Sequence, residues 1–271
     1  MSKLWIYVFV GVLTIGCHQS VKRKHPEQAS PVDLEKGIAA ENGVIKTYKA
    51  ALEQYSYYDD QVRRIAYKQE KDVINAYLDS ALSAITGSTI GDYNFIDIEG
   101  RHYTTSKLSK PLFLMTSASW CKPCLAKVPA LNKAVDEYKD SIDFIILFQD
   151  DDSYVMKIKE DYHEDIFLVP HRSKLEGGRV DLDIGGFKHL TSYPTAYLIS
   201  PEKVILKLSQ GAFIAGKFNY DKEMVVTKKQ AFLRNLNSIK NDIGLLLGKP
   251  MMVEVEDESP LHQSDYSSIK L

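Results

Sequence analysis

The sequence predicts an α/β fold in which a central sheet carries helices on its faces, with a helical extension before it. Between about residue 90 and residue 248, short apolar runs typical of strands alternate with segments whose apolar residues recur at spacings of three and four, which is typical of helices. Residues 32–86 show only the helical spacing. We therefore expect a helical region over 32–86 and an α/β domain over 87–248.

The N-terminus has the pattern of an export signal. Leu4 to Ile15 are almost wholly apolar and follow Lys3, and the run is shorter than the roughly twenty residues that span a bilayer. It ends in Gly16-Cys17, which resembles the site where bacterial lipoproteins are cleaved and lipidated. We expect 1–16 to be a lipoprotein signal peptide and Cys17 to carry lipid. The alternative is an uncleaved anchor.

Between the export signal and the α/β domain we expect a linker and two helices. Residues 17–31 are polar and contain two prolines, which favours a linker. Apolar side chains then form one stripe from Leu34 to Tyr55 and a second from Val62 to Ile85, with a turn expected at 57–60. Amphipathic helices of this length must bury their stripes on each other or on the next domain.

The α/β domain begins with a predicted hairpin from Phe95 to Thr104 that turns at Gly100. A buried strand at 112–115 is followed by a helix with Val128, Leu131, Val135 and Tyr138 on one face. Further strands are expected at 142–148, 167–169, 196–199 and 204–208, an acidic loop at 150–152, and a last helix over about 232–246. The acidic, polar tail 249–271 is expected to be disordered.

The chemistry of the chain is concentrated in Trp120-Cys121-Lys122-Pro123-Cys124, between the predicted strand and helix. The free N–H groups at a helix start favour a thiolate at Cys121, and Lys122 adds a nearby positive charge. Two cysteines three apart can close a small disulfide, so the loop has the equipment for thiol–disulfide exchange. The alternatives are half of a zinc site or an inert structural disulfide. A zinc site normally needs four ligands, and no second Cys-x-x-Cys occurs.

Composition excludes one class of partner. The chain has 34 basic and 36 acidic residues, a net charge of −2, so it lacks the basic excess that nucleic-acid binding requires. Of its three cysteines, two form the motif and the third is Cys17. An exported location would also place the motif in an oxidising compartment, where disulfide substrates occur.

The motif and its surroundings resemble the thioredoxin superfamily, in particular the TlpA/ResA-like branch of exported bacterial thiol–disulfide oxidoreductases. The match is carried by the segment from Ala118 to Cys124, by Pro129 in the following helix, and by Tyr193-Pro194-Thr195. The resemblance covers roughly residues 88 to 247. It implies a thioredoxin-like fold with a central mixed sheet flanked by helices, and a redox centre that needs no metal or other cofactor.

The resemblance also implies roles for individual residues. Cys121 and Cys124 are the expected catalytic pair, and Pro194 is expected to follow a cis peptide bond beside them. The expected substrate groove is formed by Trp120, Lys122, Pro123, Tyr193 and Pro194. The sequence departs from the family at two positions where relatives often keep a buried acid, because Met115 and Lys127 stand there.

Taken together, these features predict a membrane-anchored thiol–disulfide oxidoreductase in the bacterial cell envelope, facing the periplasm. Its expected partners are disulfide-containing exported proteins and a membrane thiol electron carrier, with the enzyme acting as a reductant. The alternative is a partner-binding lipoprotein whose thioredoxin-like domain is a scaffold or redox sensor with little catalytic turnover.

Overall fold

The computed structural model describes residues 46–65, 71–172, 183–184, 186–188, 193–219 and 223–249. The expected signal peptide, linker and lipidation site at Cys17 lie outside the described residues, as does the expected tail beyond residue 249. Among the described helices, none is long and apolar enough to cross a membrane.

Two helices precede the α/β domain, as expected, but the first ends later in the chain than the sequence suggested. Helix α2 runs from Tyr48 to Ile65 and α3 from Lys71 to Ile85, so the turn expected at 57–60 is wrong. That stretch contains neither glycine nor proline to end a helix. The ring of Tyr58 is buried and lies 6.4 Å from that of Tyr77 on α3, so this stretch continues α2 and packs against α3 instead of turning.

The beginning of α2 and the end of α3 contact the α/β domain. The Tyr48 hydroxyl lies 3.0 Å from the hydroxyl of Tyr197, and the ring of Tyr48 stacks on Phe187 at 5.3 Å. Ile85, the last residue of α3, is fully buried. The helical pair is therefore joined to the sheet by buried aromatic and aliphatic side chains.

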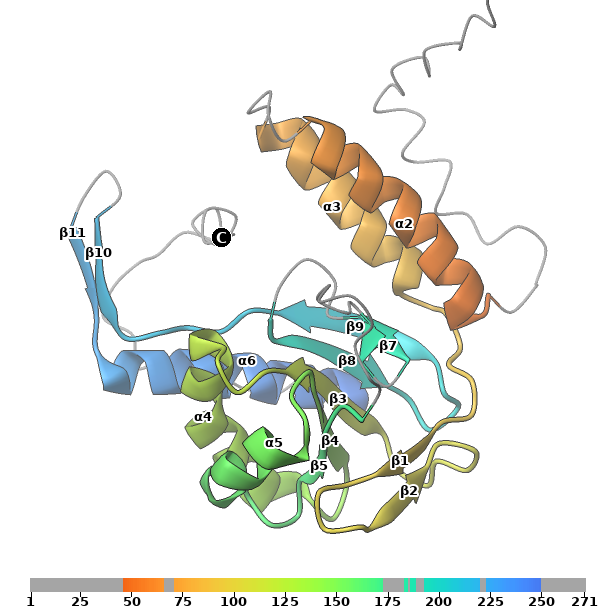
Figure 1. The fold of residues 1–271 in the computed structure, drawn as a ribbon. Helices are drawn as coiled ribbons and strands as arrows, with labels where there is room; N and C mark the ends of the chain where they lie inside the picture. The colour runs from red at the N-terminus through yellow and green to blue at the C-terminus, as the bar shows by residue number, and fades with distance from the viewer. Residues whose placement is uncertain are drawn as a thin grey trace, which may run out of the picture. The chain divides into compact units, whose positions relative to one another are not determined.

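A five-stranded mixed sheet forms the centre of the domain, with strand order β5-β4-β3-β8-β9 (Figure 1). Strands β3 (Leu112–Ser117), β4 (Asp143–Phe148) and β5 (Phe167–Val169) are parallel. Strands β8 (Thr195–Ile199) and β9 (Ile205–Gln210) are antiparallel to their neighbours. Every side chain of β3 is buried, which explains its apolar run from Leu112 to Met115. The α/β fold with a mixed sheet is confirmed.

Helices α4 (Lys122–Tyr138) and α6 (Lys228–Leu246) lie side by side and pack on the sheet (Figure 1). The main core joins one side of β3, β4 and β8 to the apolar faces of both helices. Thr227 and Gln230 form a reciprocal capping box that fixes the start of α6. Leu131 of α4 and Ile239 of α6 are both essentially fully buried in this core.

The remaining elements are short. The expected first hairpin is present as β1 (Asn94–Ile96) and β2 (His102–Thr104), with Gly100 at the positive φ of +81° that favours glycine. The sequence did not predict helix α5 (Asp152–Ile158), the 3-10 turn η3 (Lys159–Asp161) or the strand pairs β6–β7 (Asp183–Ile184, Phe187–Lys188) and β10–β11 (Gly216–Asn219, Glu223–Val226).

Candidate functional site: the Cys121–Cys124 redox centre

The redox motif begins where the most buried strand of the sheet ends. Strand β3 ends at Ser117, and the chain turns through Ala118 into α4. The Cys121 N–H donates to the Ala118 carbonyl at 3.1 Å, which closes this turn. Cys121 is the N-cap of α4, with extended backbone angles, and its Sγ accepts the Cys124 N–H at 3.2 Å. The expected position of Cys121 at a helix start is confirmed.

The two cysteines form a disulfide with their Cα atoms 5.2 Å apart. Cys121 is 4% exposed and Cys124 is fully buried. Cys121 therefore lies on the solvent side of the pair, as expected, and the sulfur of Cys124 lies behind it. The Cys124 N–H that points at Cys121 Sγ is one of the unpaired donors of the first helical turn, and it is placed to stabilise negative charge on that sulfur.

Two aromatic rings flank the disulfide. Tyr193 packs against the buried cluster formed by Ala118, Cys121 and Cys124, and its ring meets the Trp120 ring edge to face at 5.6 Å. Trp120 is 63% exposed, which is unusual for so large an apolar side chain. The structure thus brings Trp120 and Tyr193 to the redox pair, although they are 73 positions apart (193 − 120).

The peptide bond between Tyr193 and Pro194 is cis, which confirms the expectation. Thr195 follows as the first residue of β8, and its carbonyl accepts the Thr116 hydroxyl of β3 at 3.3 Å. The Pro194 carbonyl accepts the N–H of Gly211, just beyond β9, at 2.8 Å. Hydrogen bonds to β3 on one side of β8 and to the residue after β9 on the other therefore hold this loop beside the disulfide. Of the other expected groove residues, Lys122 is exposed and Pro123 is partly buried, both in the first turn of α4.

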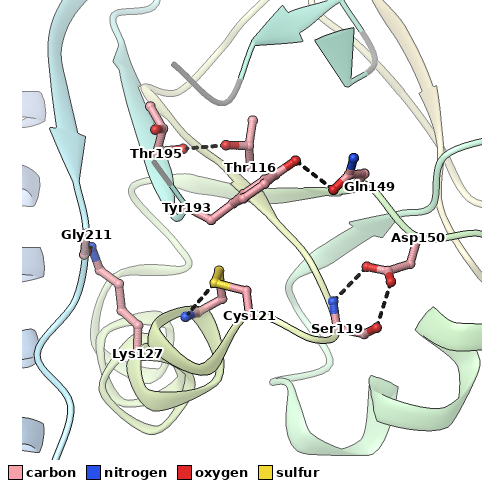
Figure 2. Close-up of a disulfide and its surroundings, with 10 residues drawn as sticks. Thr116, Ser119, Cys121, Lys127, Gln149, Asp150, Tyr193, Thr195 and Gly211 are labelled. Atoms are coloured by element: carbon pink, nitrogen blue, oxygen red, sulfur yellow. Dashed lines mark hydrogen bonds between the residues drawn. A yellow bond between two sulfur atoms is a disulfide. The ribbon is translucent and has the colours of Figure 1, made fainter. Parts of the chain in front are cut away.

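Two residues at the end of β4 support the site, and sequence reasoning missed their role. Gln149 accepts a hydrogen bond from the Tyr193 hydroxyl at 3.0 Å. Asp150 accepts both the N–H and the hydroxyl of Ser119, at 2.6 and 2.7 Å (Figure 2). One signal could have located them, because the carboxyl ends of neighbouring parallel strands meet at one edge of a sheet.

The acidic residues 150–152 are therefore more than a solvated loop. While Asp150 anchors the turn before Cys121, Asp151 is the N-cap of α5 and accepts the Ser153 N–H at 2.9 Å. Asp152 pairs with Arg172 at 2.7 Å. In the part of the chain that the structure describes, no group of three or more His, Cys, Asp or Glu side chains is placed to hold a metal ion.

The two positions that depart from the family pattern are both buried. Met115 lies fully inside the core on β3. Lys127 is on α4, one turn after Cys124, and is 1% exposed. Its ammonium group donates to the Gly211 carbonyl at 3.3 Å, and burial is the main cause that lowers the pKa of this lysine. The site thus has a buried amine where relatives often carry a buried acid.

Comparison with known proteins agrees with this geometry. The model of the Redoxin family matches residues 86–224, a range that includes both the redox pair and the cis-proline loop. A search of curated protein sequences found no match.

Several solved structures are similar to the chain. A thiol-disulfide oxidoreductase from Bacteroides fragilis is 22% identical with a TM-score of 0.38, over 46% of this chain and 92% of the other. A thio-disulfide isomerase from Thermus thermophilus is 22% identical with a TM-score of 0.37, over 48% of this chain and 88% of the other. An exposed lipoprotein thioredoxin from Streptococcus pneumoniae is 21% identical with a TM-score of 0.32, over 54% of this chain and 98% of the other.

Proposed function

Given that this chain belongs to the Redoxin family and is a thiol–disulfide oxidoreductase with a Cys-x-x-Cys redox pair, we propose that it works outside the cytoplasm on exported proteins. In this proposal lipid at Cys17 anchors the enzyme to a membrane of the bacterial cell envelope, facing the periplasm. The enzyme reduces disulfides in its clients, and a membrane thiol electron carrier then reduces the enzyme. The observation that carries the chemistry is the Cys121–Cys124 disulfide at the start of α4, beside the cis-proline loop.

The position of each sulfur supports its proposed role. Reduced Cys121, at the helix start and on the solvent side, attacks a client disulfide as a thiolate and forms a mixed disulfide, while one client sulfur leaves as a thiolate that takes up a proton. Cys124 then loses its proton and attacks Cys121. The second client sulfur leaves, and the Cys121–Cys124 disulfide forms again. The client gains two electrons from the enzyme and two protons, one matching the proton lost by Cys124 and one from solvent.

The proposed substrate groove lies between the helix start and the cis-proline loop. Trp120 and Tyr193 present aromatic surface to an approaching chain, and such surface contacts side chains of many kinds. The hydrogen bond from Tyr193 to Gln149 fixes one wall of this groove. Lys122 and Pro123 form the wall on the α4 side, since they occupy its first turn.

Support for the location comes from the sequence alone. The short apolar run after Lys3 and the Gly16-Cys17 pair have the pattern of a lipoprotein leader. A lipid anchor at Cys17 would leave a polar tether before the folded domain. Intact mass and labelled-palmitate incorporation test this directly. Loss of the label in Cys17→Ala supports the anchor, and a Cys17→Ala protein that still carries lipid excludes it.

Trapping of mixed disulfides tests the clients and the roles of the two cysteines together. Without Cys124 the intermediate cannot be resolved within the enzyme, so Cys124→Ser should accumulate covalent adducts with exported proteins that disappear on reduction. Cys121→Ser is the matched control and should trap far fewer, because the attacking thiolate is gone. Equal trapping by the two variants would show that the roles are wrongly assigned, and adducts only with cytoplasmic proteins would overturn the location.

The direction of electron flow needs a separate measurement. Pairs of this kind range from about −270 to −120 mV, so the reduction potential of the Cys121–Cys124 pair decides between reductant and oxidant. A value near the reducing end supports the proposed reductant. A value near the oxidising end, together with an enzyme found oxidised in the envelope, would make it an oxidant of exported proteins.

A further inference from the structure

A lysine is buried one helical turn behind the redox pair. Cys124 and Lys127 are three positions apart on α4, so they lie on the same face with Cβ atoms about 5–6 Å apart. Both are buried, with Lys127 only 1% exposed. Lysine is almost never fully buried unless it is paired, because removing an ammonium group from water costs free energy. The burial of Lys127 therefore calls for compensating negative charge.

Only part of that compensation comes from the elements packed around Lys127. Asp242 on α6 is 1% exposed and is the main charge that favours the ammonium form, whereas Lys207 on β9 disfavours it. Asp242 already accepts a hydrogen bond from Lys207 at 2.9 Å through Oδ1. Its Oδ2 atom has no hydrogen-bond partner among the described residues. When Lys127 is protonated, two lysines share one carboxylate, and this region then holds a surplus of positive charge.

The ammonium group of Lys127 is directed toward the cis-proline loop. It donates to the Gly211 carbonyl, and the N–H of the same glycine donates to the Pro194 carbonyl. Figure 2 shows the Lys127 side chain extending from α4 to Gly211. Residues 210–214 add no charged side chain. Lys127 therefore links α4 to Gly211, which is in turn hydrogen-bonded to the cis-proline loop.

We propose that Lys127 is a positioning residue whose buried positive charge, partly offset by Asp242, stabilises the thiolate formed when the Cys121–Cys124 disulfide is reduced. In that step a donor dithiol becomes a disulfide and gives up two protons. One proton goes to Cys124 and the other to solvent, which leaves Cys121 as the thiolate. The thiolate supplies the negative charge that this region lacks. The inference needs a reversible redox pair, but neither the location nor the clients proposed above.

Three substitutions in the full-length protein separate the charge of Lys127 from its hydrogen bond. Lys127→Gln keeps a donor for the Gly211 carbonyl and removes the charge, whereas Lys127→Arg keeps the charge. Lys133→Gln removes a charge from the exposed side of the same helix and is the matched control. The measurement is the equilibrium between oxidised and reduced protein in dithiothreitol buffers, together with the thiolate titration of Cys121.

The expected result is a shift of about tenfold toward the oxidised protein in Lys127→Gln, since a unit charge at a buried site acts on a nearby thiolate with little screening. Tenfold corresponds to about 30 mV. Lys127→Arg and Lys133→Gln should stay within about twofold of the wild type. The difference between wild type and Lys127→Gln should shrink as pH rises through the pKa of Lys127, where the charge is lost. A Lys127→Gln equilibrium equal to that of Lys133→Gln, or shifted toward the reduced protein, overturns the proposal.

A measurement on the wild-type protein keeps the test decisive if Lys127→Gln does not fold. Coupling between two charges is reciprocal, so a thiolate that Lys127 stabilises must raise the pKa of Lys127 by the same free energy. NMR titration of the lysine side-chain resonances in oxidised and reduced protein reports this pKa directly. It should be higher in the reduced protein, and an equal value in the two states overturns the proposal.

Discussion

Asn235 provides a sharp test of how the cis-proline side of the site is held, because one buried amide joins three segments. Its Oδ1 accepts the Phe213 N–H at 2.8 Å, and its Nδ2 donates to the carbonyls of Phe213 and Ala126 at 2.9 and 3.2 Å. Ala126 is on α4 and Phe213 follows Gly211, so the amide links α6 to both sides of the redox centre. We expect Asn235→Ala to lose all three hydrogen bonds at once.

The expected loss of stability follows from these contacts. Each hydrogen bond contributes about 0.5–1.5 kcal/mol, and a buried partner left unsatisfied adds to the loss. Three bonds give about 3 kcal/mol, which in a domain of this size lowers the Tm by about 6–12 °C. Urea unfolding followed by circular dichroism measures the free energy of unfolding, and thermal unfolding measures the Tm.

Asn237→Ala on the same helix is the matched control. Its side chain forms no hydrogen bond within the described part of the chain, so we expect a change within about 0.5 kcal/mol. If Asn235→Ala loses less than about 1 kcal/mol, or no more than Asn237→Ala, the three contacts do not hold the segment as argued. A loss accompanied by an unchanged rate of insulin reduction would show that the segment supports stability but not the groove.

Three further predictions concern charge and packing. The pKa of the Cys121 thiol in the reduced protein should lie below that of a free cysteine, because Cys121 is the N-cap of α4; thiolate absorbance against pH measures it, and an ordinary value would contradict the effect of the helix start. A hydrogen bond from Lys240 is the main cause that lowers the pKa of Glu137 in the folded protein. The contribution of the Glu137 carboxylate to folding stability is therefore complete above the ordinary glutamate pKa, and it is lost as pH falls through the lowered pKa of the folded protein. Glu137→Gln should therefore cost less than about 1 kcal/mol at neutral pH and nothing in strong acid, and an equal cost at both would refute the charge argument. Tyr48→Phe should cost about 1 kcal/mol in urea unfolding, since it removes the hydroxyl that contacts Tyr197 in the buried interior, and an unchanged free energy of unfolding would show that this contact adds no net stability.

Local patterns predicted the parts of the fold that local forces determine. The apolar run of β3 and the apolar spacing from Val128 to Tyr138 in α4 depend only on which side chains of each element are buried. Both elements occur where expected. The hairpin at Gly100 was predictable for the same reason, since a positive φ favours glycine. By contrast, the turn expected at 57–60 rested on the break between two apolar stripes, whereas this stretch is part of α2 and Tyr58 packs against Tyr77 on α3.

The end of β4 could be placed near the site from the strand pattern, but the hydrogen-bond partners of its residues could not be predicted, because they depend on which strands become neighbours. Gln149 and Asp150 reach Tyr193 and Ser119 only once β4 lies beside β3 and the cis-proline loop lies opposite. No sequence motif around Gln149 or Asp150 marks either residue as part of the site. Lys127 was visible as a departure from the family pattern, but its burial and its contact with Gly211 depend on the packing of α4 against the segment after β9.

The segment that leads from α3 into the α/β domain also closes one end of the sheet. Strand β9 is an edge strand, and its first residue exchanges hydrogen bonds with this segment: the Ile205 N–H donates to the Ser88 carbonyl at 2.9 Å, and the Ile205 carbonyl accepts the Gly87 N–H at 2.8 Å. The Ile90 N–H donates to the Lys203 carbonyl at 2.9 Å in the same way. An uncovered edge strand is a template for pairing with another chain. A shortened protein that begins after Ile90 would expose these backbone groups, and it should self-associate as its concentration rises even though its redox pair is intact.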